Sequence, residues 1–193
     1  MTDMEQEEIG QLRATVRKMQ DRQDILDCIV REARGRDRHD SALTASCYWP
    51  DGWDEHGPSI TGASEYPERA NAGHAAFFSA TSHSLTNHSC ELDGDDAVCE
   101  TYVLGALLSK DGSRCILSPG RYIDHMQRRE GEWRIKARRT IVDMALEGSA
   151  EWLATPALKG FLKGTWDAAD VSYARPVVIG ADGERWQQQM QDR

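Results

Sequence analysis

The chain has 193 residues, a formal net charge of -9, and apolar and charged fractions of 39% and 28%. This length and balance are typical of one soluble globular domain with a sizeable core, and they exclude a disordered chain. The acidic charge argues against a nucleic-acid-binding surface, which needs a basic stripe. No apolar run reaches membrane-spanning length and Met1–Glu8 is too polar for a signal peptide, so we expect a cytoplasmic protein without a membrane partner.

The cysteines predict neither a disulfide framework nor a zinc site, because their number is odd and no CxxC spacing occurs. Buried free thiols are expected at all five positions: Cys28, Cys47, Cys90, Cys99 and Cys115. The six histidines are scattered, and His83 with His88 do not match a standard ligand pair, so we expect no metal and no organic cofactor. The chain has no glycine-rich phosphate loop and no Gly-x-Ser-x-Gly motif, which argues against nucleotide binding and serine hydrolysis.

The first predicted element is helical, because its apolar residues alternate three and four positions apart. They are Ile9, Leu12, Val16, Met19, Leu26 and Val30. The pattern predicts one long helix or two helices broken near residues 21–24, with an end near Gly35. This helix packs on its own domain, or residues near 9–19 extend outward and pack on a neighbouring subunit.

Later segments predict an α+β layout, with N-terminal helices packed on a curved antiparallel sheet. A short helix is expected over residues 41–46 and another over 65–79. The periodicity then becomes two, and tight turns separate the expected strands over residues 87–92, 97–110, 115–129 and 132–146. In the tail, residues 152–164 predict one helix or two short ones, and 176–183 predict a loop.

Three residues form the candidate catalytic group: His83, Asp37 and Arg138. His83 lies where the chain is expected to enter the sheet, and its imidazole can act as a base if Asp37 orients it. Arg138 on the last strand could stabilise an anion. Each also has a structural alternative. His83 could be a hydrogen-bonded strand residue, Asp37 could terminate the first helix, and Arg138 could be one charge on a solvated strand face. Strict alternation would place Arg138 opposite to Trp133 and Ile135.

Aromatic residues favour a pocket for a small hydrophobic molecule, although aromatic side chains are core material by default. Tyr48 and Tyr102 are also candidates for contacting a leaving oxygen. The candidate substrate-binding residues are Tyr48, Trp49, Trp53, Phe78, Tyr102, Leu104 and Tyr122.

Three parts of the sequence resemble the SnoaL-like branch of the nuclear-transport-factor-2-like superfamily. They are the segment around Asp37, the segment Thr81–Asn87, and Gly120–Asp124 followed by Gly131–Ile135. The order and spacing of these segments carry the resemblance. It covers roughly residues 7–147, so we expect a SnoaL-like domain over 1–147 and a C-terminal extension over 148–193 that packs on the domain or on a neighbouring subunit.

The resemblance implies a cone-shaped α+β barrel with a deep apolar pocket, in homodimers or homotrimers. In lyase members such as scytalone dehydratase, hexachlorocyclohexane dehydrochlorinase and the bile-acid 7α-dehydratase, an Asp–His dyad removes a proton without metal or cofactor. Asp37 and His83 match that dyad, and Arg138 matches an arginine that assists the leaving group. Two positions depart from the pattern: Glu32 stands where some relatives have Tyr or Lys, and residues 103–106 carry no polar side chain.

These features together predict a cofactor-independent lyase of the dehydratase or deformylase type. The expected substrate is small, hydrophobic and aromatic, for example a lignin-derived diarylpropane. The alternatives are a ligand-binding module, a structural protein like the β subunit of ring-hydroxylating dioxygenases, and an isomerase like ketosteroid isomerase.

Overall fold

The chain begins with one unbroken helix, α1 (Asp3–Asp37), in the computed structural model, which describes residues 2–180 and 183–187. A capping box starts the helix: the Thr2 side chain accepts the backbone N–H of Glu5, and the Glu5 carboxylate accepts the N–H of Thr2. The helix ends just before His39, whose positive φ of 49° turns the chain away. The structure therefore has the long helix rather than two shorter ones.

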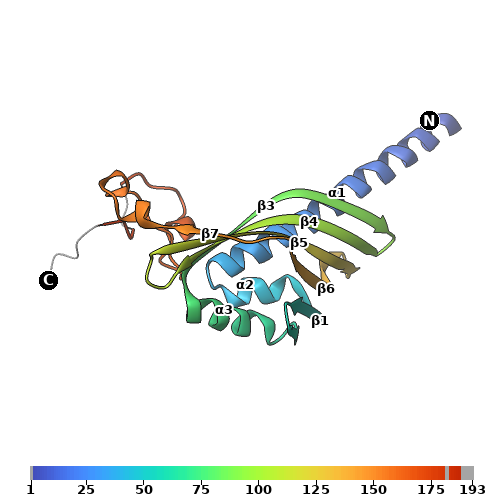
Figure 1. Ribbon diagram of the computed structural model, residues 1–193. Coiled ribbons are helices and arrows are strands. Elements are labelled where there is room, and N and C mark those ends of the chain that lie inside the picture. The colour runs from blue at the N-terminus through green and yellow to red at the C-terminus, as the bar shows by residue number, and fades with distance from the viewer. Residues whose placement is uncertain (1, 181–182, 188–193) are drawn as a thin grey trace.

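The predicted helices and the meander follow in the expected order, but two short strands that the sequence did not predict lie between the second and third helices (Figure 1). The helices and short strands that come first are α2 (Ser41–Ser46), β1 (Tyr48–His56), β2 (Ser59–Gly62) and α3 (Tyr66–Phe77). The remaining strands are β3 (Phe78–Asp93), β4 (Asp96–Ser109), β5 (Arg114–Arg129), β6 (Glu132–Val142) and β7 (Leu146–Ser149). Three short 3-10 turns follow at Glu151–Ala154, Pro156–Leu158 and Val171–Tyr173.

The strands form one curved sheet with the order β2-β1-β6-β5-β4-β3, and β7 pairs with β5. β3 to β6 make the predicted antiparallel meander, whereas β1 runs parallel to β6 and makes the sheet mixed. The helices pack on the concave side of this sheet, which stays open between β2 and β3 (Figure 1). This is the expected cone-shaped α+β fold.

β3 starts earlier than the sequence predicted. It begins at Phe78, directly after α3, so His83 lies inside the strand, opposite Gly105 of β4, and not at its entrance. β3 is an edge strand, and its residues 79–84 are mostly polar. Apolar periodicity therefore does not predict this part of the strand.

β6 contains a bulge that changes its side-chain alternation. Ile135 pairs with Met126 and Ala137 pairs with His125 of β5, so Lys136 has no partner on that strand. The extra residue turns both Ile135 and Arg138 to the buried side of the sheet. Strict alternation, which would place Arg138 opposite to Ile135, therefore fails here.

The core lies between α1 and the inner face of the sheet. It is built mostly from aliphatic, aromatic and cysteine side chains: Ile25, Cys28, Ile29, Cys47, Tyr48, Tyr66, Cys90, Cys99, Met126, Trp133 and Ile135. All five cysteines are free, and four of them are buried. Among the described residues, no helix combines the length and the apolar character needed to span a membrane.

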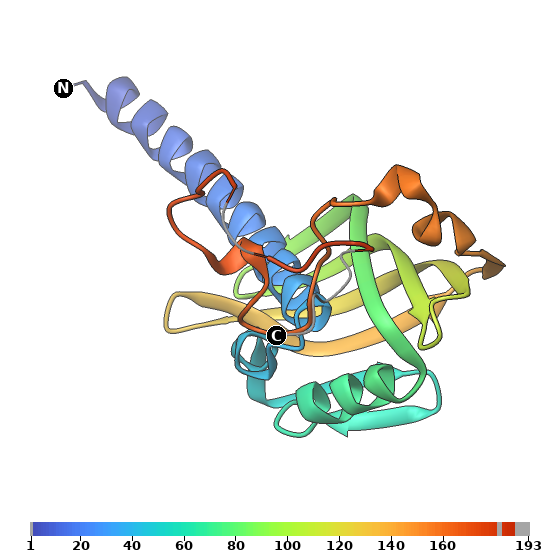
Figure 2. The same cartoon turned by 90° about the vertical axis from the view of Figure 1, so that its left-hand side faces the viewer.

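Both ends of the chain extend from this core. The N-terminal half of α1 projects past the edge of the sheet as a free-standing rod (Figure 1). The C-terminal extension runs as irregular loops, part of which lie alongside α1 (Figure 2). Its residues 181–182 and 188–193 lie outside the described part of the chain.

Candidate functional site

Asp37 and His83 are brought together across the gap between the end of α1 and the middle of β3. The Nδ1 atom of His83 lies 2.6 Å from Oδ1 of Asp37, and the backbone N–H of His83 donates to Oδ2 at 2.9 Å. The two side chains are 9% and 15% exposed. One carboxylate therefore fixes both the ring and the backbone of His83, and the Nε2 atom is left for other contacts.

A second histidine lies beside this pair. The ring of His74, from α3, stacks on the ring of His83 with centroids 6.0 Å apart and an interplanar angle of 16°. Nη2 of Arg36 lies 3.2 Å from Nδ1 of His74, and Nη1 of Arg36 donates to Oδ1 of Asn71. Burial and the positive charge of Arg36 lower the pKa of His74 to about 3, so its imidazole is neutral at physiological pH.

The orientation of His74 follows from this contact. A guanidinium can only donate hydrogen bonds, so Nδ1 of His74 must accept from Arg36. Its ring proton is then on Nε2. The site thus combines a carboxylate-oriented imidazole with a neutral imidazole that offers an N–H donor.

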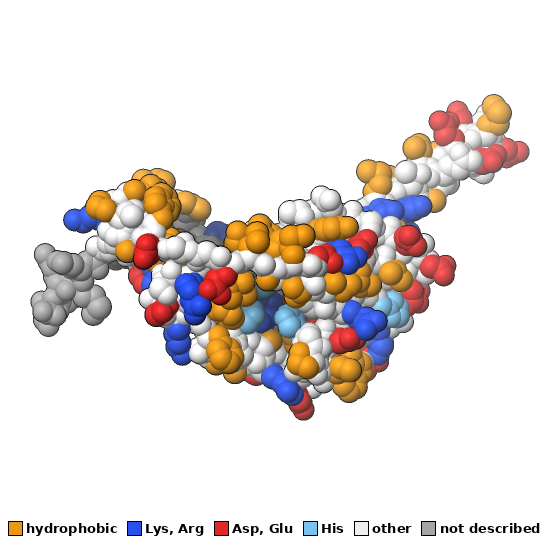
Figure 3. Space-filling view, viewed as in Figure 1, with side chains coloured by type: hydrophobic (Ala, Val, Ile, Leu, Met, Phe, Trp, Pro, Cys, Tyr) orange, Lys and Arg blue, Asp and Glu red, His pale blue; other side chains and the backbone are white. Residues whose placement is uncertain are grey.

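Two cavities lie on either side of these residues. One has a volume of about 350 Å³ and is lined by Arg36, His56, Ser59, Thr61, Tyr66, Arg69, Ala70, Gly73, His74, Phe77 and Phe78. The other has a volume of about 390 Å³ and is lined by Val30, Ala33, Arg34, Asp37, Arg38, His83 and Leu85. Figure 3 shows the molecular surface hollowed between the sheet and α3, with histidine and Lys or Arg side chains in the hollow. The first cavity has cationic and aromatic lining and no carboxylate.

Arg138 reaches the interior but is held by carboxylates. Its Nε and Nη2 donate to the two oxygens of Asp124 at 2.7 and 2.9 Å, and Nη1 donates to Glu32. Its guanidinium also lies over the ring of Tyr122, 4.0 Å from the centroid. Burial opposes its charge, but Asp124 and Glu32 hold its pKa well above the usual value. Within the described residues, no hydrogen bond or ion pair joins Arg138 to Asp37 or His83.

The candidate substrate-binding residues do not come together around His83. Tyr102 and Leu104 lie on the outer face of β4, 43% and 36% exposed, because the buried residues of that strand are the alternate ones. Trp49 donates from Nε1 to the backbone carbonyl of Gln127. Trp53 is 54% exposed.

The remaining three aromatic candidates lie inward. Phe78 lines the 350 Å³ cavity, with its ring edge-on to His74. Tyr48 and Tyr122 are buried, and the hydroxyl of Tyr48 donates to Oδ2 of Asp54 at 2.9 Å. Of the seven candidates, Phe78 alone lines either of the two cavities beside His83.

The C-terminal extension contacts the residues that directly follow Asp37. Nε of Arg38 lies 3.3 Å from Oδ1 of Asp170. The ring of His39 stacks on Trp166, with centroids 3.8 Å apart. The extension therefore helps to hold the end of α1, which carries the Asp37 carboxylate.

Sequence reasoning missed His74 and Arg36. Arg36 precedes Asp37 directly, and His74 lies four residues before Phe78 on the predicted helix. Arg36 follows Arg31 and Arg34 at the end of the predicted helix and looks like one more basic residue of the last turns. Only its burial, at 2% exposed, marks it as part of the interior.

Comparisons with known proteins agree with this fold. Residues 17–139 match the family model of the SnoaL-like domain. No curated protein matches the chain. A candidate scytalone dehydratase from Novosphingobium aromaticivorans shares 20% identity over 68% of this chain and 90% of its own, with a TM-score of 0.62. A hexachlorocyclohexane dehydrochlorinase from Novosphingobium barchaimii shares 19% identity over 69% of this chain and 94% of its own, with a TM-score of 0.62.

A protein of unknown function from Mycobacterium tuberculosis is also similar, with 25% identity over 67% of this chain and 75% of its own, and a TM-score of 0.60. The likeness to these structures concerns the fold. The family match covers well over half of the chain and includes both Asp37 and His83. The chain therefore belongs to the SnoaL-like family, within the nuclear-transport-factor-2-like superfamily.

Proposed function

We propose that this protein is a cofactor-independent lyase, of the dehydratase or deformylase type, in which His83 removes a proton from a small aromatic substrate. The observation that carries the proposal is the contact between Nδ1 of His83 and Oδ1 of Asp37 at 2.6 Å. Membership of the SnoaL-like family is consistent with it, since the similar structures include a dehydrochlorinase and a candidate dehydratase.

The base in this mechanism is Nε2 of His83. The Asp37 carboxylate accepts the Nδ1 proton, so the lone pair of the ring is on Nε2, and the negative charge stabilises the imidazolium that forms when Nε2 takes a proton. The second hydrogen bond, from the backbone N–H of His83 to Oδ2 of Asp37, holds the carboxylate beside the imidazole. A base oriented in this way typically contributes about a hundred- to ten-thousand-fold in rate.

His74 can assist the other half of the reaction. Its Nε2–H lies on a ring stacked beside His83, so it can donate a hydrogen bond to an oxygen that becomes negative as the proton leaves carbon. Arg36 keeps that ring neutral and correctly oriented. In dehydration, the departing hydroxide takes the proton that His83 removed from carbon and leaves as water. In loss of formaldehyde, His83 instead takes the proton of a hydroxymethyl oxygen and the C–C bond breaks to release formaldehyde. The electron pair left on carbon then expels the neighbouring hydroxide, which leaves as water with that proton.

The 350 Å³ cavity supports an aromatic substrate. His74 lines it and stacks on His83, and His83 itself lines the 390 Å³ cavity. Phe77 and Phe78 supply apolar and aromatic surface, and Arg36 and Arg69 supply positive charge at the same cavity. A lignin-derived diarylpropane is one substrate that combines aromatic rings with the hydroxyl groups such a site would recognise.

The test compares His83→Ala with a matched control. His125 also pairs with a carboxylate, its Nε2 lying 2.7 Å from Oδ1 of Asp96, but on an exposed part of the sheet. Wild type, His83→Ala, Asp37→Asn and His125→Ala are incubated with aromatic alcohols, diarylpropanes and steroids, and products are identified by mass spectrometry. We expect loss of water or formaldehyde with wild type and His125→Ala, and a rate at least a hundredfold lower with His83→Ala.

Other outcomes reject the proposal. A product of unchanged mass would identify an isomerase. Turnover by His83→Ala at the wild-type rate would remove His83 as the base. Binding of a panel compound without any turnover would favour a ligand-binding module, and co-purification with a large iron–sulfur protein would favour a structural subunit.

A further inference from the structure

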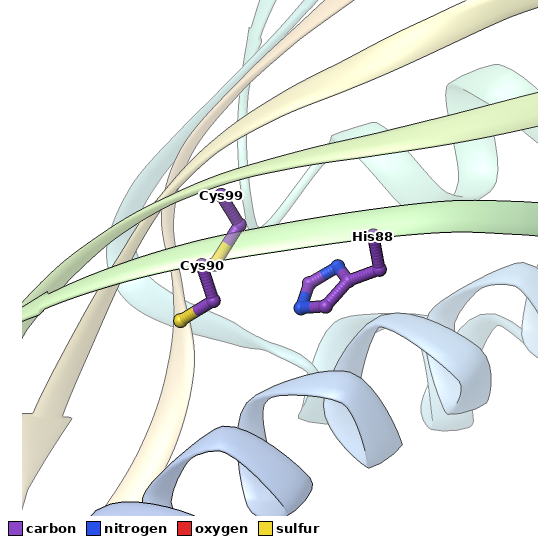
Figure 4. A group of neighbouring side chains, drawn as sticks. All are labelled: His88, Cys90 and Cys99. Carbon is purple, nitrogen blue, oxygen red and sulfur yellow. The ribbon is translucent and has the colours of Figure 1, made fainter.

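A cluster of soft metal ligands lies on the inner face of the sheet, away from the Asp37–His83 pair. It contains His88 and Cys90 of β3 and Cys99 of β4 (Figure 4). One ligand atom from each residue lies within 4.8 Å of the other two. At about 3.3 Å per residue, His88 is roughly 16 Å along the strand from His83. The cluster is therefore separate from the candidate active site.

Strand register explains why these three side chains meet. Cys90 pairs directly with Cys99 across the β3–β4 ladder, and His88 pairs with Thr101. His88 and Cys90 are two residues apart on one strand, so both project to the same face. Figure 4 shows the imidazole beside the two cysteine side chains, above α1. Both cysteines are buried and free.

The imidazole is oriented toward this cluster and incompletely bonded. Nδ1 of His88 lies 2.8 Å from the hydroxyl oxygen of Thr101. Nε2 of His88 is buried and has no hydrogen-bond partner among the described residues. An imidazole nitrogen held by a hydroxyl on one side and free on the other is the arrangement that orients histidine ligands in metal sites.

We propose that His88, Cys90 and Cys99 bind a thiophilic divalent cation, with Zn²⁺ as the best match. Two thiolates and an imidazole are the donors that Zn²⁺ prefers, and ligand atoms of a tetrahedral zinc site lie about 3.8 Å apart, so small side-chain rotations close the site. The three residues leave the fourth coordination position for water or another small ligand. This inference goes beyond the sequence, which predicted no metal site, and does not depend on the proposed lyase activity.

Metal binding would release protons, because cysteine binds metal as the thiolate. The guanidinium of Arg22, from α1, donates to the backbone carbonyl of Cys90 at 2.8 Å and brings a positive charge close to the thiolates. Bound metal would also join β3 to β4 from the side that faces α1. We therefore expect the metal to stabilise the folded protein.

The experiment titrates Co²⁺ into full-length protein that has been reduced and stripped of metal with a chelator. Wild type should give a thiolate-to-Co²⁺ charge-transfer band that saturates at one equivalent and disappears when Zn²⁺ is added. His88→Ala and the double variant Cys90→Ser with Cys99→Ser should lose at least tenfold in affinity. Cys115→Ser, which removes a cysteine outside the cluster, should bind like wild type. Absence of the band in wild type, or its persistence in the double variant, would overturn the proposal.

A second measurement needs no variant of the buried cluster. Buried thiols react only when the fold opens, so wild-type protein is alkylated with iodoacetamide until Cys90 and Cys99 are labelled without Zn²⁺. The same reaction is repeated with Zn²⁺, and labelled cysteines are mapped by mass spectrometry. Zn²⁺ should protect Cys90 and Cys99 more strongly than the buried pair Cys28 and Cys47, which belongs to no three-ligand cluster among the described residues. Equal labelling of Cys90 and Cys99 in both conditions would count against the site even if the variants fail to fold.

An independent observation concerns the projecting part of α1. Asp21 is the first helix residue with a long-range contact, accepting from Arg128 and from Nε1 of Trp133. Before it, the apolar residues Leu12, Val16 and Met19 are 59%, 60% and 65% exposed. A helix segment of this length is marginal in water on its own, so a partner is needed to cover its apolar stripe.

We infer that this segment pairs in parallel with the same segment of a second copy of the chain. Ile9 and Val16 occupy a positions and Leu12 and Met19 occupy d positions of a heptad. In a parallel pair, each g position faces the e position five residues later in the partner. In the projecting segment these pairs are Glu8 with Arg13, which are oppositely charged, and Thr15 with Gln20, which are uncharged. Ile25 and Ile29 pack in the core of the domain, whereas Ile9, Leu12 and Val16 line an open groove of about 760 Å³ next to the sheet, which a partner helix would fill.

Sedimentation of the full-length protein tests the pairing. Wild type should be a dimer or a larger assembly that Leu12→Glu with Val16→Glu dissociates. Glu8→Arg should weaken association, and adding Arg13→Glu to it should restore association by reversing both charges. Arg17→Glu, outside the a, d, e and g positions, should have no effect. A monomeric wild type, or a Leu12→Glu, Val16→Glu variant that stays assembled, would overturn the inference.

Discussion

The buried carboxyl of Asp54 gives a test of the interior that does not need a substrate. It is 1% exposed and accepts a hydrogen bond from the Tyr48 hydroxyl, but its Oδ1 has no hydrogen-bond partner among the described residues. Burial raises its pKa from 3.8 to about 7, which the positive charge of Arg138 only partly offsets. Asp54→Asn keeps the shape and the acceptor for Tyr48 and removes the ionisation.

The sign of the effect follows from proton binding. A carboxyl whose pKa is raised on folding binds its proton more tightly in the folded protein, so the free energy of unfolding of wild type falls between about pH 4 and pH 7. A difference of about three pKa units corresponds to a loss on the order of 4 kcal/mol. Asp54→Asn has no such loss. Its stability relative to wild type should therefore rise over this range by a few kcal/mol and stay constant above pH 8.

Urea unfolding of both proteins at equal concentration, at intervals from pH 4 to pH 9, measures this difference. The pH-dependent contributions of titratable groups common to both proteins cancel in the difference between their free energies of unfolding. Asp143→Asn is the matched control, because Arg121 lowers the pKa of Asp143 below its usual 3.8, so this carboxyl stays ionised in the folded protein throughout the range tested. The stability of that variant relative to wild type should therefore change little from pH 4 to pH 9. A difference between Asp54→Asn and wild type that is the same at every pH would refute the reasoning.

Three further changes probe packing around the site. Arg138→Met should lower the free energy of unfolding by about 3–5 kcal/mol in urea, because it leaves two buried carboxylates without their cation. Gly120→Ala should destabilise by about 1–3 kcal/mol, since a Cβ there would overlap the backbone carbonyl of the neighbouring strand, whereas Gly148→Ala, with open space around it, should not. Trp166→Ala removes the stacking on His39 and should speed amide hydrogen exchange over residues 164–173 while β5 is unaffected.

Periodicity was enough to predict the elements whose residues alternate cleanly. The short helix over 41–46 is found as α2, and the meander from β4 to β6 is found with its turns at Glu130-Gly131 and Asp111-Gly112. The first half of β3 was missed because an edge strand carries polar residues on both faces. The bulge at Lys136 was missed because a register shift depends on the partner strand, and the local sequence does not contain it.

The candidate site was likewise predicted only in part. Asp37 and His83 meet although 46 residues separate them, and the resemblance to a known family carried that prediction. The aromatic candidates were chosen by residue type, and residue type does not say which face of a strand a side chain takes. Tyr102 and Leu104 therefore lie on the outer face. His74 was invisible in sequence, because its importance comes from stacking on His83 after α3 folds back against β3.

The unusual residue at position 32 has a physical explanation in the buried ion cluster. The family resemblance implied Tyr or Lys at this position, whereas Glu32 of this chain is fully buried and binds Arg138. A Lys at that position would face the Arg138 guanidinium, and like charges at that distance repel strongly in a buried site. Arg138, held between Glu32 and Asp124, is likewise committed to structure. In the mechanism that we propose, assistance to the leaving group therefore comes from His74, whose Nε2–H lies on a ring stacked beside His83.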